Sequence, residues 1–234
     1  MLKNIVRRAL QRKGIQVRRE PGLIDFLSTH GIDLVVDVGA NEGQFASSLR
    51  EIGYRGRIVS FEPVESVYAL LCERANSDPK WETRQLALGS KAGRQRISVS
   101  ANSVFSSLLP QLRAAVEFDP AAAVVRSEEI EVVRFDDLFG GWHERKIFLK
   151  VDTQGFERQV IQGARASLSA IQGIQLELPV VQLYAGNWSF EGALGEMREL
   201  GFEPAQIRPV TKRGDDRSSA LEFDCVFRRI ERLK

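Results

Sequence analysis

The sequence has few of the residues from which disulfide frameworks and most zinc sites are built. It contains two cysteines, Cys72 and Cys225, and two histidines, His30 and His143. Neither cysteine stands in a metal-ligand spacing, and two cysteines are too few for a disulfide framework. The histidines lie far apart in the chain and form no motif. Cysteine usage therefore points to a reduced compartment.

Long apolar runs are also absent. No stretch approaches the length needed to cross a bilayer, and no signal peptide, internal repeat or low-complexity segment is apparent. The formal net charge is +2 over 234 residues, which argues neither for nor against a nucleic-acid partner. Length and composition are those of one sizeable α/β domain. A cytoplasmic protein is the default expectation.

The chain is organised around residues 34–45, which read LVVDVGANEGQF. The first five residues predict a buried parallel strand, and the amphipathic segment that follows predicts a helix. Gly39 and Gly43 let the backbone turn sharply and let a ligand lie against it. Asp37, near the end of the strand, can accept hydrogen bonds from an ammonium. Such a corner binds nucleotides in open α/β sheets, although glycine can also serve the turn alone.

A second apolar strand, residues 57–61, ends in Glu62 and Pro63. An acidic residue at this strand tip, roughly 20 to 25 residues after the first glycine, is where an α/β nucleotide site holds the ribose. A carboxylate can accept from both ribose hydroxyls at once. The two features together predict an adenosine-type ligand. A dinucleotide-dependent oxidoreductase is a lesser alternative, because its Gly-x-Gly-x-x-Gly pattern is absent.

The rest of the chain alternates between segments typical of strands and segments typical of helices. Further strands are predicted at 83–87, 96–100, 130–135, 147–151, 173–178, 204–208 and 222–228, and further helices at 22–30, 64–76, 108–116, after 156 and at 190–200. This alternation indicates a mostly parallel sheet with ligands at the carboxyl ends of its strands. The last two strands can pair as an antiparallel hairpin at the sheet edge. The irregular connection 101–129 is interpreted as a substrate loop or lid.

Acidic residues fall at four predicted strand ends: Asp37, Glu62, Asp152 and Glu177. Lys150 lies within an otherwise apolar strand, where a buried ammonium needs a partner. Asp152 points the same way along a strand of period two, and Glu157 lies just beyond it. We interpret Lys150, Asp152 and Glu157 as one ionic cluster. Its role is either a structural salt bridge or the orientation and activation of a substrate.

Several motifs together resemble a known family. They are Asp37–Phe45, Phe61–Pro63, Ala87–Gly89, Phe135–Leu138, Phe148–Glu157 with Gly163 and Ala164, and Leu176–Glu177 with Leu183 and Tyr184. The chain is similar, from about Leu34 to Arg228, to the FkbM family of S-adenosylmethionine-dependent methyltransferases. The resemblance implies a class I methyltransferase fold: a seven-stranded, mostly parallel sheet with an antiparallel last strand and helices on both faces. It also implies O-methylation, commonly of a sugar hydroxyl in a glycan, glycolipid or natural product.

The resemblance also implies roles for single residues. The amino-acid part of S-adenosylmethionine would be held by Asp37, Gly39, Asn41 and Gly43, its ribose by Glu62 with Pro63 beside it, and its adenine would be bordered by Ala87 and Leu88. Asp152 would lie near the sulfonium. The candidates to receive or orient the acceptor hydroxyl are Asp152, Glu157, Glu177 and, through its charge, Lys150. Further lining residues would be Asn102, Ser106 and Ser107.

Other features bear on the acceptor. Phe105, Tyr184 and Trp188 either stack on a sugar face or belong to the core. DNA or RNA amino-group methylation is disfavoured, because those enzymes often carry Asp/Asn-Pro-Pro-aromatic where this chain has Asp152-Thr-Gln-Gly. We therefore expect a small-molecule or glycan acceptor and no nucleic acid. Carboxylates suit divalent ions, but nothing in the spacing requires a metal. A catalytically inactive methyltransferase-like binding protein is the main alternative.

Residues 1–30 are expected to form a basic, helical N-terminal extension of a methyltransferase domain spanning 31–234. Within 1–19, apolar residues recur at helical spacing among seven lysines and arginines. One interpretation is an interfacial helix attracted to anionic lipid at the inner face of the membrane. The other is a solvated helix that packs on the domain edge or on a second subunit. The sequence indicates neither an oligomeric state nor a particular acceptor.

Overall fold

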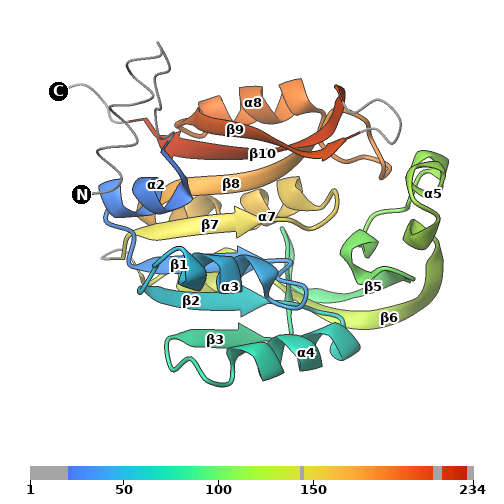
Figure 1. Ribbon diagram of the computed structural model, residues 1–234, viewed down its shortest axis with the longest axis horizontal. Helices are drawn as coiled ribbons and strands as arrows, with labels where there is room; N and C mark the ends of the chain where they lie inside the picture. The colour runs from blue at the N-terminus through green and yellow to red at the C-terminus, as the bar shows by residue number, and fades with distance from the viewer. Residues whose placement is uncertain (1–20, 143–144, 213–217, 231–234) are drawn as a thin grey trace, which may run out of the picture.

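A seven-stranded sheet runs through the centre of the protein in the order β3-β2-β1-β7-β8-β10-β9 (Figure 1). The structure is a computed structural model that describes residues 21–142, 145–212 and 218–230. The strands are β1 (Leu34–Val38), β2 (Arg57–Phe61), β3 (Trp81–Arg84), β7 (Ile147–Val151), β8 (Ile171–Pro179), β9 (Phe202–Lys212) and β10 (Ala220–Arg229). The first five of these strands pair in parallel, whereas β10 is antiparallel to β8 and β9. The predicted sheet, including its reversed last strand, is confirmed.

The burial of the central strands β1 and β7 explains why both are continuous apolar runs in the sequence. All five residues of β1 and all five of β7 are buried. Strands covered on both faces need apolar side chains on both faces. Asp37 and Lys150 are the exceptions, and they are direct register partners on the adjacent strands. The two charges therefore lie side by side on one face of the sheet.

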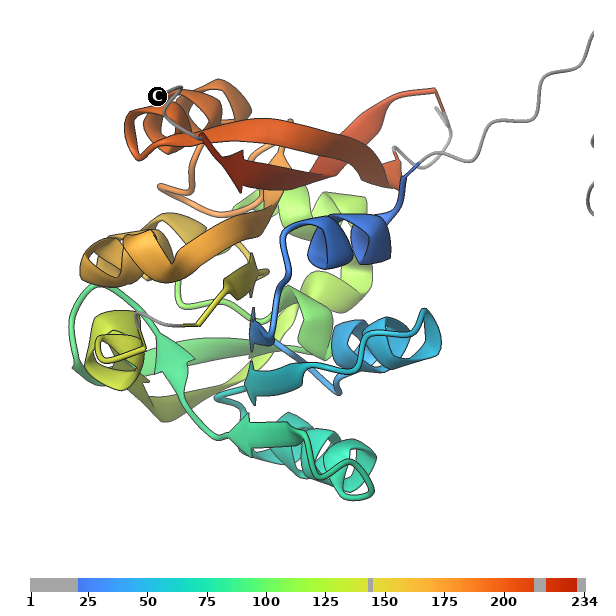
Figure 2. The ribbon, with the colours of Figure 1, turned by 90° about the vertical axis from the view of Figure 1, so that its left-hand side faces the viewer.

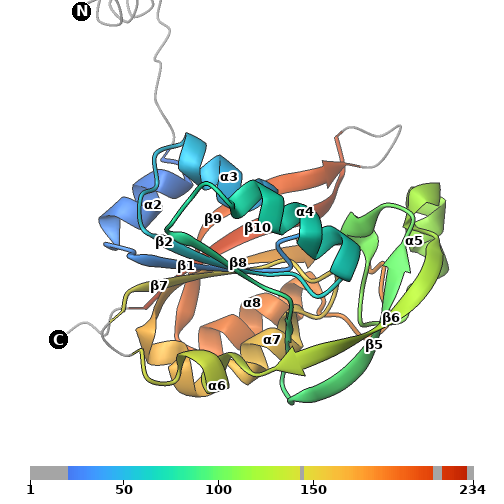
Figure 3. The ribbon, with the colours of Figure 1, turned by 90° about the horizontal axis from the view of Figure 1, so that it is seen from below.

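Helices cover both faces of the sheet, as predicted (Figures 2 and 3). One layer holds α2 (Leu23–Thr29), α3 (Gln44–Glu51) and α4 (Glu65–Ala75), and the other holds α6 (Phe135–Phe139), α7 (Glu157–Gly163) and α8 (Phe190–Glu199). Each layer buries its own apolar cluster against the sheet. In the first layer, Phe26 of α2 packs edge-on against Phe148 of β7, with ring centroids 5.7 Å apart.

A second, three-stranded sheet lies beyond the carboxyl ends of the central strands (Figure 1). It consists of β4 (Ala87–Leu88), β5 (Gly93–Ser100) and β6 (Val124–Val133). The connection between β5 and β6 contains α5 (Arg113–Phe118) and short turns. The strand predicted at 83–87 is in fact divided, because β4 pairs with β6 and not with β2. The strand predicted at 130–135 begins earlier and ends at Val133, since Phe135 starts α6.

The predicted basic helix within residues 1–19 lies outside the described residues. In the described part of the chain, no helix is long and apolar enough to span a membrane.

A close backbone contact between α7 and the end of β4 makes a testable stability prediction. A Cβ added at Gly163 would overlap the carbonyl oxygen of Gly89. We expect Gly163→Ala to lower the free energy of unfolding by roughly 1–3 kcal/mol, because overpacking would push the two backbones apart. Urea unfolding followed by circular dichroism measures the change.

Gly195 in α8 provides the matched control. Nothing lies within 4 Å of a Cβ added there. Gly195→Ala should raise the free energy of unfolding by about 0.4–1 kcal/mol, because alanine restricts the unfolded chain. If Gly163→Ala behaved like this control, the α7–β4 contact would not be close-packed.

Candidate active site

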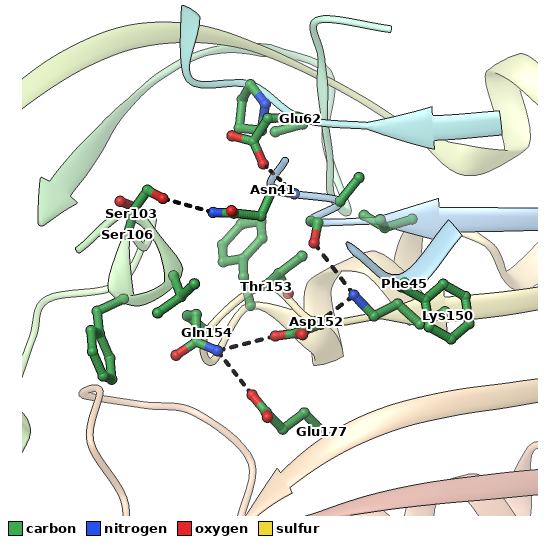
Figure 4. Close-up of a pocket in the computed structure, with 18 of the residues that line it drawn as sticks. Asn41, Phe45, Glu62, Ser103, Ser106, Lys150, Asp152, Thr153, Gln154 and Glu177 are labelled. Atoms are coloured by element: carbon green, nitrogen blue, oxygen red, sulfur yellow. Dashed lines mark hydrogen bonds and ion pairs between the residues drawn. The ribbon is translucent and has the colours of Figure 1, made fainter. Parts of the chain in front are cut away.

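A cavity of about 560 Å³ opens at the carboxyl ends of β1, β2, β7 and β8 (Figure 4). The β5–β6 connection supplies the facing wall, with Ser103, Phe105 and Phe118 among its residues. One end of the cavity is closed by the last two strands, through Val210 of β9 and Glu222 and Asp224 of β10. The segment interpreted from the sequence as a substrate loop thus borders the cavity directly.

The turn after β1 depends on unusual backbone conformations. Gly39 and Gly43 have φ of 72° and 87°, and Asn41 has φ of 48°. A Cβ on Gly39 would overlap the carbonyl oxygen of Asp152, so only glycine lets the ends of β1 and β7 come this close. Gly43 does not line the cavity. It is the residue before α3, and a Cβ there would lie 2.8 Å from the Trp81 ring.

Glu62 lies at the end of β2 and is 6% exposed. Its Oε2 accepts a hydrogen bond from the backbone N–H of Asn41 at 2.9 Å, and its Oε1 accepts from that of Val64 at 3.0 Å. These bonds hold the carboxylate over the glycine turn and leave a lone pair on each oxygen for a ligand. Burial raises the pKa of Glu62 to about 7, against the lowering effect of the two backbone donors.

Lys150 connects the floor of the cavity to the end of β7. Its Nζ lies 3.3 Å from Asp37 Oδ1 and 3.3 Å from Asp152 Oδ2, and its side chain is 8% exposed. Ser60 donates to the other oxygen of Asp37 at 3.2 Å, and the Phe45 ring centroid lies 5.4 Å from the ammonium. Burial alone would lower the pKa of Lys150, but the carboxylates of Asp152 and Asp37 outweigh it and raise the pKa. The ammonium therefore stays charged.

Gln154 joins two carboxyl groups on the other side of the cavity. Its Nε2 donates to Asp152 Oδ1 at 3.0 Å and to Glu177 Oε2 at 2.8 Å, while its Oε1 accepts from the hydroxyl of Tyr184 at 3.0 Å. Burial and then the charge of Asp152 raise the pKa of Glu177 well above its usual range. Burial also acts to raise the pKa of Asp152, but Lys150 reverses the effect and lowers it. Asp152 is therefore the carboxylate that stays ionised.

Glu157 requires a correction. It is 3% exposed in the first turn of α7, and its Oε1 accepts from the backbone N–H groups of Thr153 and Gly155 and from the Thr153 hydroxyl. It therefore holds the turn after β7 and does not line the cavity. The interpretation of Glu157 as part of one ionic cluster with Lys150 and Asp152 is wrong, because the backbone donors of the turn occupy it. The ammonium pairs with a carboxylate of β1 instead.

The other candidate residues divide into two groups. Those that line the cavity are Gly39, Asn41, Glu62, Pro63, Ala87, Leu88, Phe105, Ser106, Lys150, Asp152 and Glu177. Those that do not are Asp37, Gly43, Asn102, Ser107, Glu157, Tyr184 and Trp188. Tyr184 and Trp188 are 2% and 6% exposed, so they belong to the core. Within the described residues, no group of three or more His, Cys, Asp or Glu side chains is arranged to hold a metal ion.

Sequence reasoning missed several residues that line the cavity, chiefly Phe45, Gln154, Gln175 and Asp224. Gln175 carried a usable signal, because it is a polar residue inside a largely apolar strand, as Lys150 is. Gln154 carried none, since its role depends on a left-handed backbone with φ of 54°. Asp224 faces the cavity only because β10 runs antiparallel beside β8, opposite Glu177.

Residues 37–204 match the family model described as the methyltransferase FkbM domain. The chain belongs to the FkbM methyltransferase family. This membership confirms the predicted family and the predicted class of enzyme, an S-adenosylmethionine-dependent methyltransferase. The matched region begins at the end of β1 and extends to the start of β9, so it contains Glu62, Lys150 and Asp152.

Solved structures resemble this FkbM protein only distantly. The methyltransferase domain of bacterial CtHen1 is 11% identical with a TM-score of 0.47, covering 89% of this chain and 95% of that chain. The fibrillarin/Nop5p complex is 11% identical with a TM-score of 0.48, covering 95% of this chain and 79% of that chain. The LepI complex with SAM is 12% identical with a TM-score of 0.44, covering 91% of this chain and 49% of that chain. These likenesses say nothing about the acceptor. No curated protein matches the chain by sequence.

The pairing of Lys150 with Asp37 makes a stability prediction for this protein. Lys150→Met should lower the free energy of unfolding by roughly 3–5 kcal/mol, because it leaves a fully buried carboxylate without its cation. Adding Asp37→Asn to the same chain should recover part of this loss, since it removes the stranded charge. Urea unfolding of both single variants and the double variant at neutral pH measures the coupling. Simple additivity of the two single losses would show that the residues are not coupled.

Proposed function

We propose that this FkbM protein transfers a methyl group from S-adenosylmethionine to a hydroxyl, and that the acceptor is a sugar of a glycan, glycolipid or natural product. The observation that carries the proposal is the position of the ionised Asp152. It lies in one cavity, with the glycine turn and Glu62 on one side and with the polar side chains of Gln154 and Glu177 on the other. The first side suits the cofactor, and the second suits an acceptor with hydroxyl groups.

The residues of the cofactor side fit S-adenosylmethionine. Glu62 keeps free lone pairs for the two ribose hydroxyls, and Gly39 presents backbone without a Cβ. Ala87 and Leu88 supply an apolar border for the adenine. Asp37 is fully buried behind this surface, so we assign it to holding Lys150 and not to direct contact with the cofactor. Such a mix of apolar walls and a few placed polar groups is typical of cofactor sites.

The chain's own contribution to the reaction is to place the acceptor and to take its proton. The sulfonium supplies a methyl group that is already activated for displacement. Holding the acceptor oxygen in line with that methyl group can supply much of the rate enhancement. Asp152 is 34% exposed within the cavity and is kept ionised by Lys150, so it can take the hydroxyl proton as the C–O bond forms. Gln154 holds Asp152 and Glu177 in position.

Calorimetric titration with S-adenosylhomocysteine tests the cofactor side. We expect Glu62→Ala to weaken binding by about tenfold or more, because two hydrogen bonds to a charged group are lost. Since the pKa of Glu62 is raised to about 7, wild-type affinity should rise as the pH increases through that value and the carboxylate ionises. Glu62→Gln should remove this pH dependence.

Glu65→Gln is the control for this titration, because Glu65 lies at the exposed start of α4 outside the cavity. It should bind as the wild type does, with the same pH dependence. A folded wild-type protein that failed to bind S-adenosylhomocysteine would overturn the assignment of this side to the cofactor.

Transfer of a radiolabelled methyl group to a panel of glycans tests the base. Asp152→Asn should lower turnover by roughly 10²–10⁴-fold, because it removes the group that takes the proton. Its affinity for S-adenosylhomocysteine should stay within about tenfold of the wild type, a change of at most about 1.4 kcal/mol. Glu177→Gln should cost less turnover than Asp152→Asn, because burial and the charge of Asp152 raise the pKa of Glu177 and make it the less readily ionised of the two carboxyl groups.

Two results would contradict these assignments. Full activity of Asp152→Asn would remove Asp152 as the base. Cofactor binding without transfer to any sugar would favour an inactive methyltransferase-like binding protein over O-methylation.

A further inference from the structure

A row of polar side chains crosses the sheet face that α2 and α3 cover. Register places Asp37 beside Lys150 and Lys150 beside Gln175, on three successive strands. Two residues after Gln175 on β8, Glu177 is the register partner of Asp224 on β10, and Asp224 in turn is the register partner of Arg208 on β9. Polar groups on a covered face are costly unless they are paired with each other or with a ligand. The row leads from the active-site cavity to the edge strand.

A second hollow, of about 160 Å³, lies at the edge-strand end of this row. Its lining residues are Leu23, Phe45, Gln175, Gln206, Arg208, Asp224 and Val226. Three of them, Phe45, Gln175 and Asp224, also line the active-site cavity. The two spaces are therefore neighbours that share side chains. Gln175 is also the register partner of Lys150, whose ammonium contacts Asp152.

The lining of this second hollow combines an aromatic ring with groups that both donate and accept hydrogen bonds. Gln175 and Gln206 can each do both, Arg208 donates and Asp224 accepts. Arg208 and Asp224 are opposite each other in register, so their charges offset. A neutral ligand with several hydroxyl groups satisfies this set better than an ion does. Phe45 offers a ring against which the C–H face of a sugar can pack.

The backbone near α2 closes one rim of the hollow. Arg208 donates to the carbonyl oxygen of Pro21 at 3.1 Å, and Gln206 Nε2 lies 3.4 Å from the same oxygen. These bonds hold the two side chains at the rim. Gln206 Nε2 also donates to the carbonyl oxygen of Gly22 at 3.4 Å, so Gln206 offers mainly its Oε1 acceptor, whereas the exposed Arg208 keeps donors for a further partner.

We propose that the second hollow binds a neutral sugar unit next to the one that is methylated. The inference rests on the proposed function, because the methylated hydroxyl must lie at Asp152. If the second hollow binds such a unit, the preferred acceptor is at least a disaccharide or a glycoside of one. Asp224 and Gln175, shared by both spaces, contact both units, and Arg208 and Gln206 contact only the second.

Methyl transfer to matched mono-, di- and trisaccharides tests this inference, using the full chain and radiolabelled S-adenosylmethionine. The wild type should prefer the disaccharide over its monosaccharide by about tenfold or more in kcat/KM. Arg208→Ala should remove most of that preference, mainly by raising KM for the disaccharide. Gln206→Ala should act in the same direction. Arg94→Ala is the control, since Arg94 is an exposed residue of β5 that lines neither space.

The outcomes separate the inference from the proposed function. An unchanged disaccharide preference in Arg208→Ala and Gln206→Ala would overturn the sugar subsite, as would a wild type with no such preference. Weaker binding of S-adenosylhomocysteine by Arg208→Ala would assign the hollow to the cofactor and also overturn it. Failure to methylate any sugar, with S-adenosylhomocysteine still bound, would instead overturn the proposed function.

Discussion

The buried ammonium of Lys150 is the interaction on which both the sheet and the site depend. It lies between Asp37 on β1 and Asp152 at the end of β7, so it joins the two central strands at the floor of the cavity. An apolar pair of the same volume would hold two strands together equally well or better, because desolvating ions is costly. Stability alone therefore does not account for the charges. Their distinctive effect is electrostatic, since the ammonium keeps Asp152 ionised among carboxyl groups whose pKa values burial raises.

The environment gives four similar carboxyl groups four different roles. Glu62 is held by two backbone donors beside the glycine turn, and Glu157 is occupied by the turn after β7. Asp152 has a cation beside it, whereas Glu177 has chiefly other carboxylates around it. Gln154 connects the last two. The residue type alone does not predict the role of any of these carboxyl groups, because the role depends on the groups that each one contacts.

This contrast explains how far the sequence could lead. The central strands were predictable because burial on both faces demands apolar runs, and Lys150 was conspicuous within one of them. Glu157 was misjudged because its partners are backbone N–H groups, which leave no mark in the sequence. The aromatic residues Tyr184 and Trp188 could not be assigned to core or cavity, since distant segments decide their burial. The same holds for Asp224, which reaches the cavity through strand register alone.

The cavity is lined by two parts of the chain, the region that matches the family model and the β9–β10 hairpin that follows it, and this division concerns how an acceptor could be selected. The family match covers residues 37–204, which include the glycine turn, Glu62 and Asp152. Gln206, Arg208 and Asp224 lie beyond it, on the hairpin of β9 and β10. In the proposed function, cofactor binding and proton transfer are the same for every acceptor, whereas the proposed contacts to a second sugar depend on which acceptor is bound. Gln206 and Arg208 contact the backbone near α2, whereas the charge of Asp224 acts on both Asp152 and Lys150. Of the residues proposed to contact the acceptor, the two on the edge strand β9 are therefore the ones that can change with least effect on Asp152 and Lys150.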